Sequence, residues 1–292
     1  MWVLYALLSA FFIATTDPIA KKVLLKTGDE YVVGWSCFLL STPFLAIYCF
    51  SNKIVPVSPE LIRIMVFYVL PFEVFAAFLY YRALKLTDIS LSVPFLALTP
   101  VFVLLTGFLI LDERVSPAGI AGIALITVGV YSINIKEAKG GLLGPIKAIL
   151  ANKGSLYMAL VSVIFSVTAV LSKKVMLLSS PQSAPLIYNL SISLALAPIV
   201  IYRLKKGTSV VGKERAIILS YAALGLLSAL SSIFFFKAMS MTSAVYAVSI
   251  KRLSLLMSVG YGWLFFRERD IHIRLASTLS MVLGVALILM SR

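Results

Sequence analysis

SAVYAVSIKRLSLLMSVGYGWLFFRER, residues Ser243–Arg269, is the stretch that decides the fold. It is mostly apolar and long enough to cross a bilayer, yet Lys251 and Arg252 lie about eight residues from its start. At about 1.5 Å per residue, the two cations are about 12 Å deep in a hydrocarbon core of roughly 30 Å. A cation at that depth costs on the order of 2.5–3.5 kcal/mol on insertion scales, so the fold must compensate both.

The helical period gives the direction in which Lys251 points. At about 100° per residue, Lys251 shares one helix face with a stripe of small residues: Ala244, Ala247, Ser254, Ser258 and Gly262. Small residues on a membrane helix mark the side that faces other helices or a cavity. We therefore expect Lys251 to point inward, with Arg252 one step round the helix.

The composition is that of an all-α polytopic membrane protein. The chain has 292 residues, of which 61% are hydrophobic and 13% charged, more apolar than a soluble domain of this size. The net charge of +14 comes largely from short loops between apolar runs, where cations orient the chain and meet anionic lipid. Nucleic-acid binding is therefore not expected. We expect an integral, multi-pass protein of the plasma (inner) membrane, and its first apolar run is interpreted as an uncleaved span.

Ten transmembrane helices are predicted, in a first five-helix repeat at 1–135, a basic linker at 136–154 and a second five-helix repeat at 155–292. The expected spans are Trp2–Leu25, Tyr31–Phe50, Leu61–Leu86, Ile89–Leu111, Pro117–Ile135, Ser155–Leu178, Pro185–Leu204, Ala216–Met239, Ala244–Phe266 and Ile273–Met290.

The two halves carry matching residues, at an offset of 155 in their later parts and of 152 to 153 near their starts, where Lys21-Lys22-Val23 matches Lys173-Lys174-Val175. The pairs include Ala83 and Ala238, Thr87 and Thr242, Gly107 and Gly262, Glu113 and Glu268, and Gly129 and Gly284. Because each unit has an odd number of spans, the second copy enters the membrane upside down. Inverted repeats of this kind are typical of secondary transporters, which bind substrate near mid-membrane between the halves.

The first repeat also resembles a known family. The segment AFLYYRALKLTDISLSVPFLALTPVFVLLTGFLILDERVSPAGIAGIALITVGV is similar to the core of an EamA module. The resemblance rests on the Tyr81–Leu84 run, Pro100, the Glu113-Arg114 pair and a glycine-rich fifth span, and the second half follows it more loosely through Glu268 and Gly284. It implies the drug/metabolite transporter superfamily: ten-span bundles around a central cavity that move amino acids, nucleotide sugars, sugar phosphates or other metabolites.

The pair Lys251-Arg252 resembles a narrower group, the plastid sugar-phosphate translocators. In that group a Lys-Arg pair in the ninth span contacts the substrate phosphate. Those translocators have a further substrate-binding lysine in the fourth span, where this chain has Leu96. The resemblance thus supports an anionic substrate, but it does not identify the anionic group as a phosphate.

Lys251 and Arg252 are the first candidates for substrate binding, as a point charge and a planar fork for a carboxylate or phosphate. The alternatives are a structural ion pair between helices, or snorkelling to the interface. Tyr80 is a further substrate-binding candidate. Tyr81, Phe235 and Phe236 could line the same cavity or be ordinary packing.

Asp17 and Glu73 are candidates for proton coupling or for ion pairs. Asp17 lies deep in the first span before Pro18, which removes a backbone hydrogen-bond donor; its alternative role is counter-charge to Lys21 or Lys22. Glu73 lies midway along the third span, where an isolated carboxyl group is expected to carry a proton. Its alternative role is a salt bridge to Lys251 or Arg252.

These features predict a secondary active transporter of a small anionic or zwitterionic metabolite (an organic phosphate, carboxylate or amino acid) that works by alternating access. Protons or a counter-substrate would drive it, and a monomer or homodimer is expected. The alternatives are a flippase or exporter for a lipid-linked sugar and, in another class, a non-transporting membrane scaffold or receptor. No catalytic set, metal-ligand spacing or cofactor motif is visible, so we expect no enzyme activity, cofactor or metal.

The distribution of cations predicts the topology. Seven Lys or Arg lie near the side of the termini and seventeen near the other side, so the positive-inside rule places both termini outside the cytoplasm.

Overall fold

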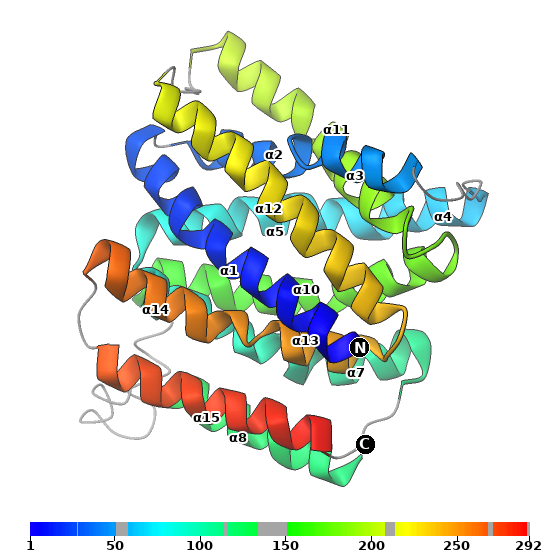
Figure 1. Cartoon of the computed structure of the whole chain (residues 1–292), viewed down its shortest axis with the longest axis vertical. Helices are drawn as coiled ribbons and strands as arrows, with labels where there is room; N and C mark the ends of the chain where they lie inside the picture. The colour runs from blue at the N-terminus through cyan, green and yellow to red at the C-terminus, as the bar shows by residue number, and fades with distance from the viewer. Residues whose placement is uncertain are drawn as a thin grey trace.

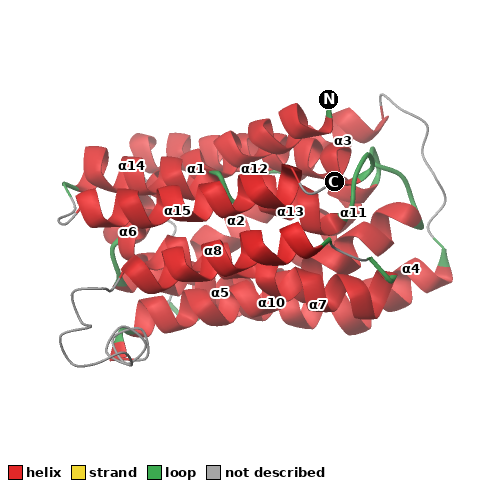
Figure 2. Cartoon of the chain, turned by 90° about the horizontal axis from the view of Figure 1, so that it is seen from below, coloured by secondary structure: helices red, strands yellow, loops and turns green. Residues whose placement is uncertain are grey.

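The computed structural model describes residues 1–27, 29–50, 58–113, 116–133, 151–207, 214–267 and 271–290. Within these ranges the chain forms helices, turns and loops, and no strand (Figure 2). The predicted linker lies largely outside the described residues, and the division of the chain at 1–135, 136–154 and 155–292 stays a prediction.

Both halves of the described chain are built from helices. The first half contains α1 (Trp2–Thr27), α2 (Glu30–Leu39), α3 (Thr42–Phe50), α4 (Pro59–Ile64), a π-helical turn η1 (Met65–Val69), α5 (Leu70–Leu86), α6 (Ile89–Ser92), a 3₁₀ segment η2 (Val93–Leu98), α7 (Thr99–Leu111) and α8 (Pro117–Ile133). The second contains α10 (Lys153–Leu177), α11 (Ala184–Lys205), α12 (Arg215–Met239), α13 (Ala244–Lys251), α14 (Ser254–Phe266) and α15 (Ile271–Met290).

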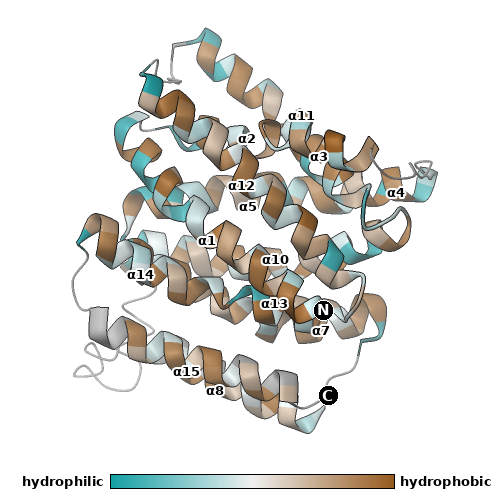
Figure 3. Ribbon diagram, viewed as in Figure 1, coloured by the Kyte–Doolittle hydropathy of each residue, from teal (hydrophilic) through white to brown (hydrophobic). Residues whose placement is uncertain are grey.

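In the described ranges, seven helical segments are long and apolar enough to cross a membrane. The other three predicted spans correspond to α8, to α13 with α14, and to α15. The all-helical membrane fold is therefore confirmed, while the number of ten spans stays a prediction. Figure 3 shows hydrophobic residues along the middle of the helices and hydrophilic residues mainly towards their ends, as a bilayer requires.

Corresponding helices of the two halves run in opposite directions. In Figure 1, α1, α5 and α8 run from right to left, whereas α10, α12 and α15 run from left to right. The start of α1 and the end of α15 lie at the same end of the bundle. An inverted two-repeat fold requires both features.

Helix packing follows the same symmetry. The helix α1 packs against α12, and its repeat mate α10 packs against α5, which is the mate of α12. The last helices of the halves, α8 and α15, pack against each other, away from the centre of the bundle (Figure 1). Gly129 allows their close approach, because a Cβ atom there would lie 2.8 Å from the backbone oxygen of Ser277.

Local backbone geometry repeats as well. Asp112 ends α7 with φ 51° and Arg267 ends α14 with φ 52°, and these are the only non-glycine residues with positive φ in the described chain. The two positions differ by the repeat offset of 155. Likewise, Lys21 donates to the carbonyl of Thr87, and its counterpart Lys173 donates to the carbonyl of Thr242, the counterpart of Thr87. The sequence repeat is thus also a repeat of contacts.

The predicted ninth span, Ala244–Phe266, is not one continuous helix. It ends at Lys251 and restarts at Ser254, and the backbone N–H of Leu253 and Leu255 donate to carbonyls three residues earlier. The predicted fourth span has the 3₁₀ segment η2 before Thr99, the mate of Ser254. A tight turn of this kind in a membrane helix is tolerated where it lines a cavity.

Candidate functional site

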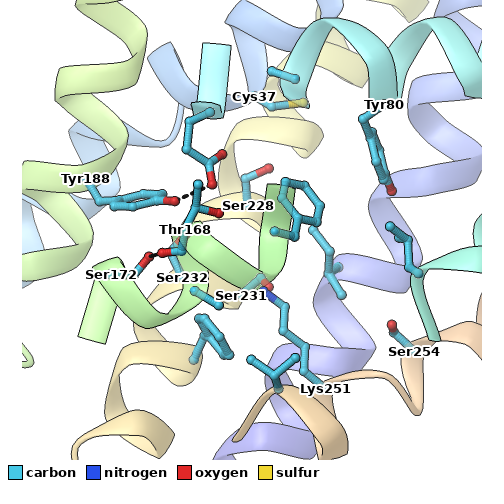
Figure 4. A pocket seen from close by; sticks show the side chains of 18 of the residues that line it. Cys37, Tyr80, Thr168, Ser172, Tyr188, Ser228, Ser231, Ser232, Lys251 and Ser254 are labelled. Atoms are coloured by element: carbon cyan, nitrogen blue, oxygen red, sulfur yellow. Dashed lines mark hydrogen bonds between the residues drawn. The ribbon is translucent and has the colours of Figure 1, made fainter. Parts of the chain in front are cut away.

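A central cavity of about 200 Å³ lies between the two halves. Its walls come from α1, α2, α5 and η2 of the first half and from α10 to α14 of the second. All five predicted site residues line it: Asp17, Glu73, Tyr80, Lys251 and Arg252. Figure 4 shows Tyr188 and Ser172 on one side of the cavity, Tyr80 on the other, and Lys251 reaching in between them.

Lys251 is the last residue of α13, and its side chain enters the cavity. The ammonium nitrogen lies 4.0 Å from the centre of the Phe235 ring, a cation–π contact. The described residues provide no carboxylate within the 4.0 Å that defines an ion pair. The Lys251–Glu73 salt bridge considered from the sequence is therefore not formed in this conformation.

Arg252 lies in the turn between α13 and α14. Its Nη2 donates to the hydroxyl of Thr99 at 2.8 Å. Its Nε is buried and has no hydrogen-bond partner. An unsatisfied buried donor is costly, so an acceptor that reached this nitrogen would stabilise it. Thr99 comes from the opposite half and begins α7.

Asp17 is almost fully buried, with 3% of its surface exposed. Its carboxylate accepts hydrogen bonds from the hydroxyl of Tyr80 and from that of Ser258, the latter at 2.6 Å. These partners are hydroxyls from α5 and α14, in place of the Lys21 or Lys22 considered from the sequence. Pro18 is accommodated within α1, which continues to Thr27.

Glu73 is also buried, with 5% of its surface exposed, and it accepts a hydrogen bond of 2.5 Å from the hydroxyl of Tyr188 on α11. The cavity thus holds two carboxyl groups, each bound by a tyrosine hydroxyl. It also holds two cations, and no carboxylate of the described residues contacts either of them.

Two partners of the predicted site residues were not predicted from the sequence: Tyr188, which lines the cavity, and Thr99, which does not. Tyr188 and Thr99 bind predicted site residues from distant parts of the chain. A repeat-based comparison could have indicated Thr99, since it is the mate of Ser254, and Ser254 lines the cavity. Nothing comparable indicates Tyr188. The aromatic candidates Tyr81, Phe235 and Phe236 do line the cavity.

Among the described residues, no group of three His, Cys, Asp or Glu could hold a metal ion. The arrangement of polar groups is that of a binding cavity: hydroxyl, cationic and aromatic side chains converge on a space that is large enough for a small molecule.

Comparison with known proteins identifies the family. Residues 1–135 and 152–290 match the EamA-like transporter family. A solved structure described only as "Crystal structure of protein" matches with a TM-score of 0.69 and 17% sequence identity, covering 98% of this chain and 97% of that chain. That identity shows the fold alone. No curated protein matches the sequence. The chain is therefore an integral, multi-pass membrane protein that belongs to the EamA-like transporter family, whose members are transporters of small molecules.

Proposed function

We propose that the protein is a secondary active transporter that carries a small anionic or zwitterionic metabolite through the central cavity by alternating access. The observation that carries this proposal is the state of Lys251 and Arg252. Both lie in a cavity between the halves, and within the part of the chain that the structure describes neither contacts a carboxylate. Two cations without a carboxylate partner are costly inside a membrane. A substrate with a negative charge would compensate them.

The two cations define how the anionic group would bind. The Arg252 guanidinium has one nitrogen on Thr99 and a buried Nε without a partner among the described residues, and a carboxylate or phosphate oxygen of the substrate would supply the acceptor that Nε lacks. Lys251 supplies a second positive charge against the face of Phe235. Organic phosphates, carboxylates and amino acids all present the required group. Tyr80 would contact the remainder of the substrate.

The broken helices supply the hinges for alternating access. The turn at Arg252–Leu253 and the 3₁₀ segment η2 lie at equivalent positions of the two repeats. Mid-helix turns of this type are frequent at hinges. Rocking of one half against the other about these turns would open the cavity to each side of the membrane in turn. The Arg252–Thr99 hydrogen bond crosses between the halves, so substrate binding at Arg252 would act directly on the moving contact.

Asp17 and Glu73 are the proposed proton carriers. Each carboxyl group is buried and bound by tyrosine hydroxyl groups, and each lines the same cavity as the cations. Taking up a proton at either group would change the net charge that the substrate meets. We propose the plasma (inner) membrane as the location and a monomer or homodimer as the functional unit.

A ligand screen tests the proposed binding site. The purified protein would be melted against a panel of organic phosphates, carboxylates and amino acids, and the affinity of any stabilising compound measured. Lys251→Gln removes one charge-assisted contact, so we expect at least about tenfold weaker binding. Lys237→Gln is the matched control, because Lys237 makes a similar cation–π contact, 5.1 Å from the Tyr5 ring, outside the cavity lining. Equal affinities of both variants and the wild type would contradict the assignment of Lys251.

A further inference from the structure

Much of the hydrogen-bonding capacity of the central cavity is used within the protein. Tyr80 donates its hydroxyl proton to Asp17, and Tyr188 donates to Glu73 in the same way. Side-chain hydrogen bonds within the protein engage four further polar residues of the lining: Ser172, Asn189, Ser231 and Ser232. Of the buried side-chain atoms of the described chain that lack a hydrogen-bond partner, only the Arg252 Nε belongs to the cavity lining. The unmet capacity of these buried groups is therefore confined to the cationic part of the cavity.

This distribution of donors sets the polarity of a matching substrate. A polar group that loses water without gaining a hydrogen bond weakens binding, so a sugar, with a hydroxyl group on most of its carbons, fits the cavity poorly. A carboxylate concentrates its polarity in two oxygen atoms, which a guanidinium and an ammonium group can both reach. The cavity thus favours a substrate whose polar atoms lie at one end.

Aromatic rings supply much of the remaining lining, in two clusters. The first cluster is Tyr80, Tyr81 and Phe165, and the second is Tyr188, Phe235 and Phe236. In the first, the other two ring centres lie 5.2 and 6.3 Å from that of Tyr80; in the second, they lie 5.8 and 6.2 Å from that of Phe236. Figure 4 shows Tyr80 and Tyr188 on opposite sides of the cavity. The space between the two clusters suits an apolar body.

The repeat adds an apolar side chain where the other half has a cation. Leu96 is the mate of Lys251 at the offset of 155, and both line the cavity. One half therefore supplies the charge and the other an apolar surface at the equivalent position. The volume limits the size of the body: a cavity of about 150 Å³ accommodates benzene, so about 200 Å³ accommodates a six-membered ring with a short carboxylate arm.

We propose that the substrate is a carboxylate with an apolar, ring-sized body, bound with its carboxylate at Lys251 and Arg252 and its body between the two aromatic clusters. This inference rests on the proposed transport function and narrows its substrate class. It sets the carboxylates apart from the organic phosphates, whose charged group has more oxygen atoms and whose sugar or polyol body needs hydrogen-bond partners along its length.

Affinities of matched small molecules for the purified full chain in detergent test the proposal. Thermal-shift titrations would compare 3-phenylpropionate, propionate and glucose 6-phosphate. Propionate has the carboxylate without the ring, so 3-phenylpropionate should bind at least about tenfold more tightly, the value of burying the ring. Glucose 6-phosphate should bind more weakly than 3-phenylpropionate. Lys251→Gln should weaken the binding of 3-phenylpropionate.

Phe165→Ala tests the apolar wall, and the repeat offers its control. The variant should weaken 3-phenylpropionate roughly tenfold and leave propionate unchanged, a difference that a general loss of stability would not produce. Phe12→Ala is the matched control, because Phe12 is the mate of Phe165 at the offset of 153, is also half-buried, and stacks on Phe234 outside the cavity lining. It should bind both carboxylates as the wild type does.

Three results would overturn the inference. Propionate bound as tightly as 3-phenylpropionate, or equal losses in Phe165→Ala and Phe12→Ala, would show that no apolar body is recognised. Glucose 6-phosphate bound more tightly than 3-phenylpropionate, and weakened by Lys251→Gln, would remove the substrate class but leave the proposed transport of an anion standing. If Lys251→Gln weakens no probe, the proposed function fails as well. The wild-type comparison decides the question even where Phe165→Ala fails to fold.

Discussion

The ion pair between Glu113 and Lys173 should be a main stabilising contact between the two halves. Glu113 follows α7 in the first half, and its carboxylate accepts from Lys173 Nζ at 2.7 Å and from the backbone N–H of Ala244 at 3.1 Å. Lys173 also donates to the carbonyl of Thr242 at 2.9 Å. The side chains of Glu113 and Lys173 are only 13% and 14% exposed. The carboxylate therefore joins the end of one helix to α10 and caps the start of α13.

Two contributions set the size of the effect. A hydrogen bond to a charged partner is worth about 1.5–3 kcal/mol, and a helix N-cap about 1 kcal/mol. Glu113→Gln removes the charge and weakens both, so we expect the free energy of unfolding to fall by about 3 kcal/mol, roughly a hundredfold in the unfolding equilibrium. Lys173→Met should cost a similar amount, and the double variant less than the sum, because the two residues share one interaction.

Neighbouring residues provide the control. Lys174 lies 4.0 Å from Glu60, and these side chains are 39% and 47% exposed. Exposed pairs contribute about 0–1 kcal/mol, so Glu60→Gln should change stability little. Unfolding by denaturant in mixed micelles measures all four variants. Equal losses for Glu60→Gln and Glu113→Gln, or strictly additive losses for Glu113 and Lys173, would refute the reasoning.

Three further predictions follow from packing, charge and topology. Gly129→Ala should lower the melting temperature, because the new Cβ would lie 2.6 Å from Met281 Cγ and 2.8 Å from the Ser277 carbonyl oxygen. Gly260→Ala is the control: a Cβ there meets no side chain or neighbouring helix within 4 Å, so its melting temperature should stay unchanged. Thermal melting of both variants tests the prediction. Tyr188→Phe removes the hydroxyl that binds Glu73 and should lower the free energy of unfolding by about 1.5–3 kcal/mol in mixed micelles. An unchanged free energy of unfolding would contradict this prediction. A reporter that is active only in the cytoplasm should stay silent when fused to the C-terminus, and a strong signal would overturn the predicted orientation.

The repeat and the inward direction of Lys251 could be predicted because both leave local patterns in the sequence. The offset of 155 is visible in matched residues such as Glu113 and Glu268, and the structure repeats it in the backbone of Asp112 and Arg267. The stripe of small residues predicted that Lys251 faces other helices or a cavity, and Lys251 lines the central cavity. Periodicity reports which face of a helix is buried, and that information was sufficient for these features.

The hydroxyl partners and the helix breaks could not be predicted. Ser258 and Asp17 are 241 residues apart, and Tyr188 and Glu73 are 115 apart, so no local pattern links them. The turn at Arg252–Leu253 contains no glycine or proline, the usual sequence signals of a break. Its cause is tertiary: Arg252 is held in the turn by Thr99 of the other half.

Transport in proteoliposomes by Lys251→Gln, and by Lys251→Gln combined with Glu73→Gln, tests the central claim most directly. Because no ion pair joins these two residues, the single change should leave the melting temperature nearly unaltered and abolish uptake of the ligand identified by the screen. Adding Glu73→Gln removes the buried carboxyl group and should not restore transport. A stable double variant with full transport activity would show that Lys251 balances Glu73 structurally, and would remove it from the binding site.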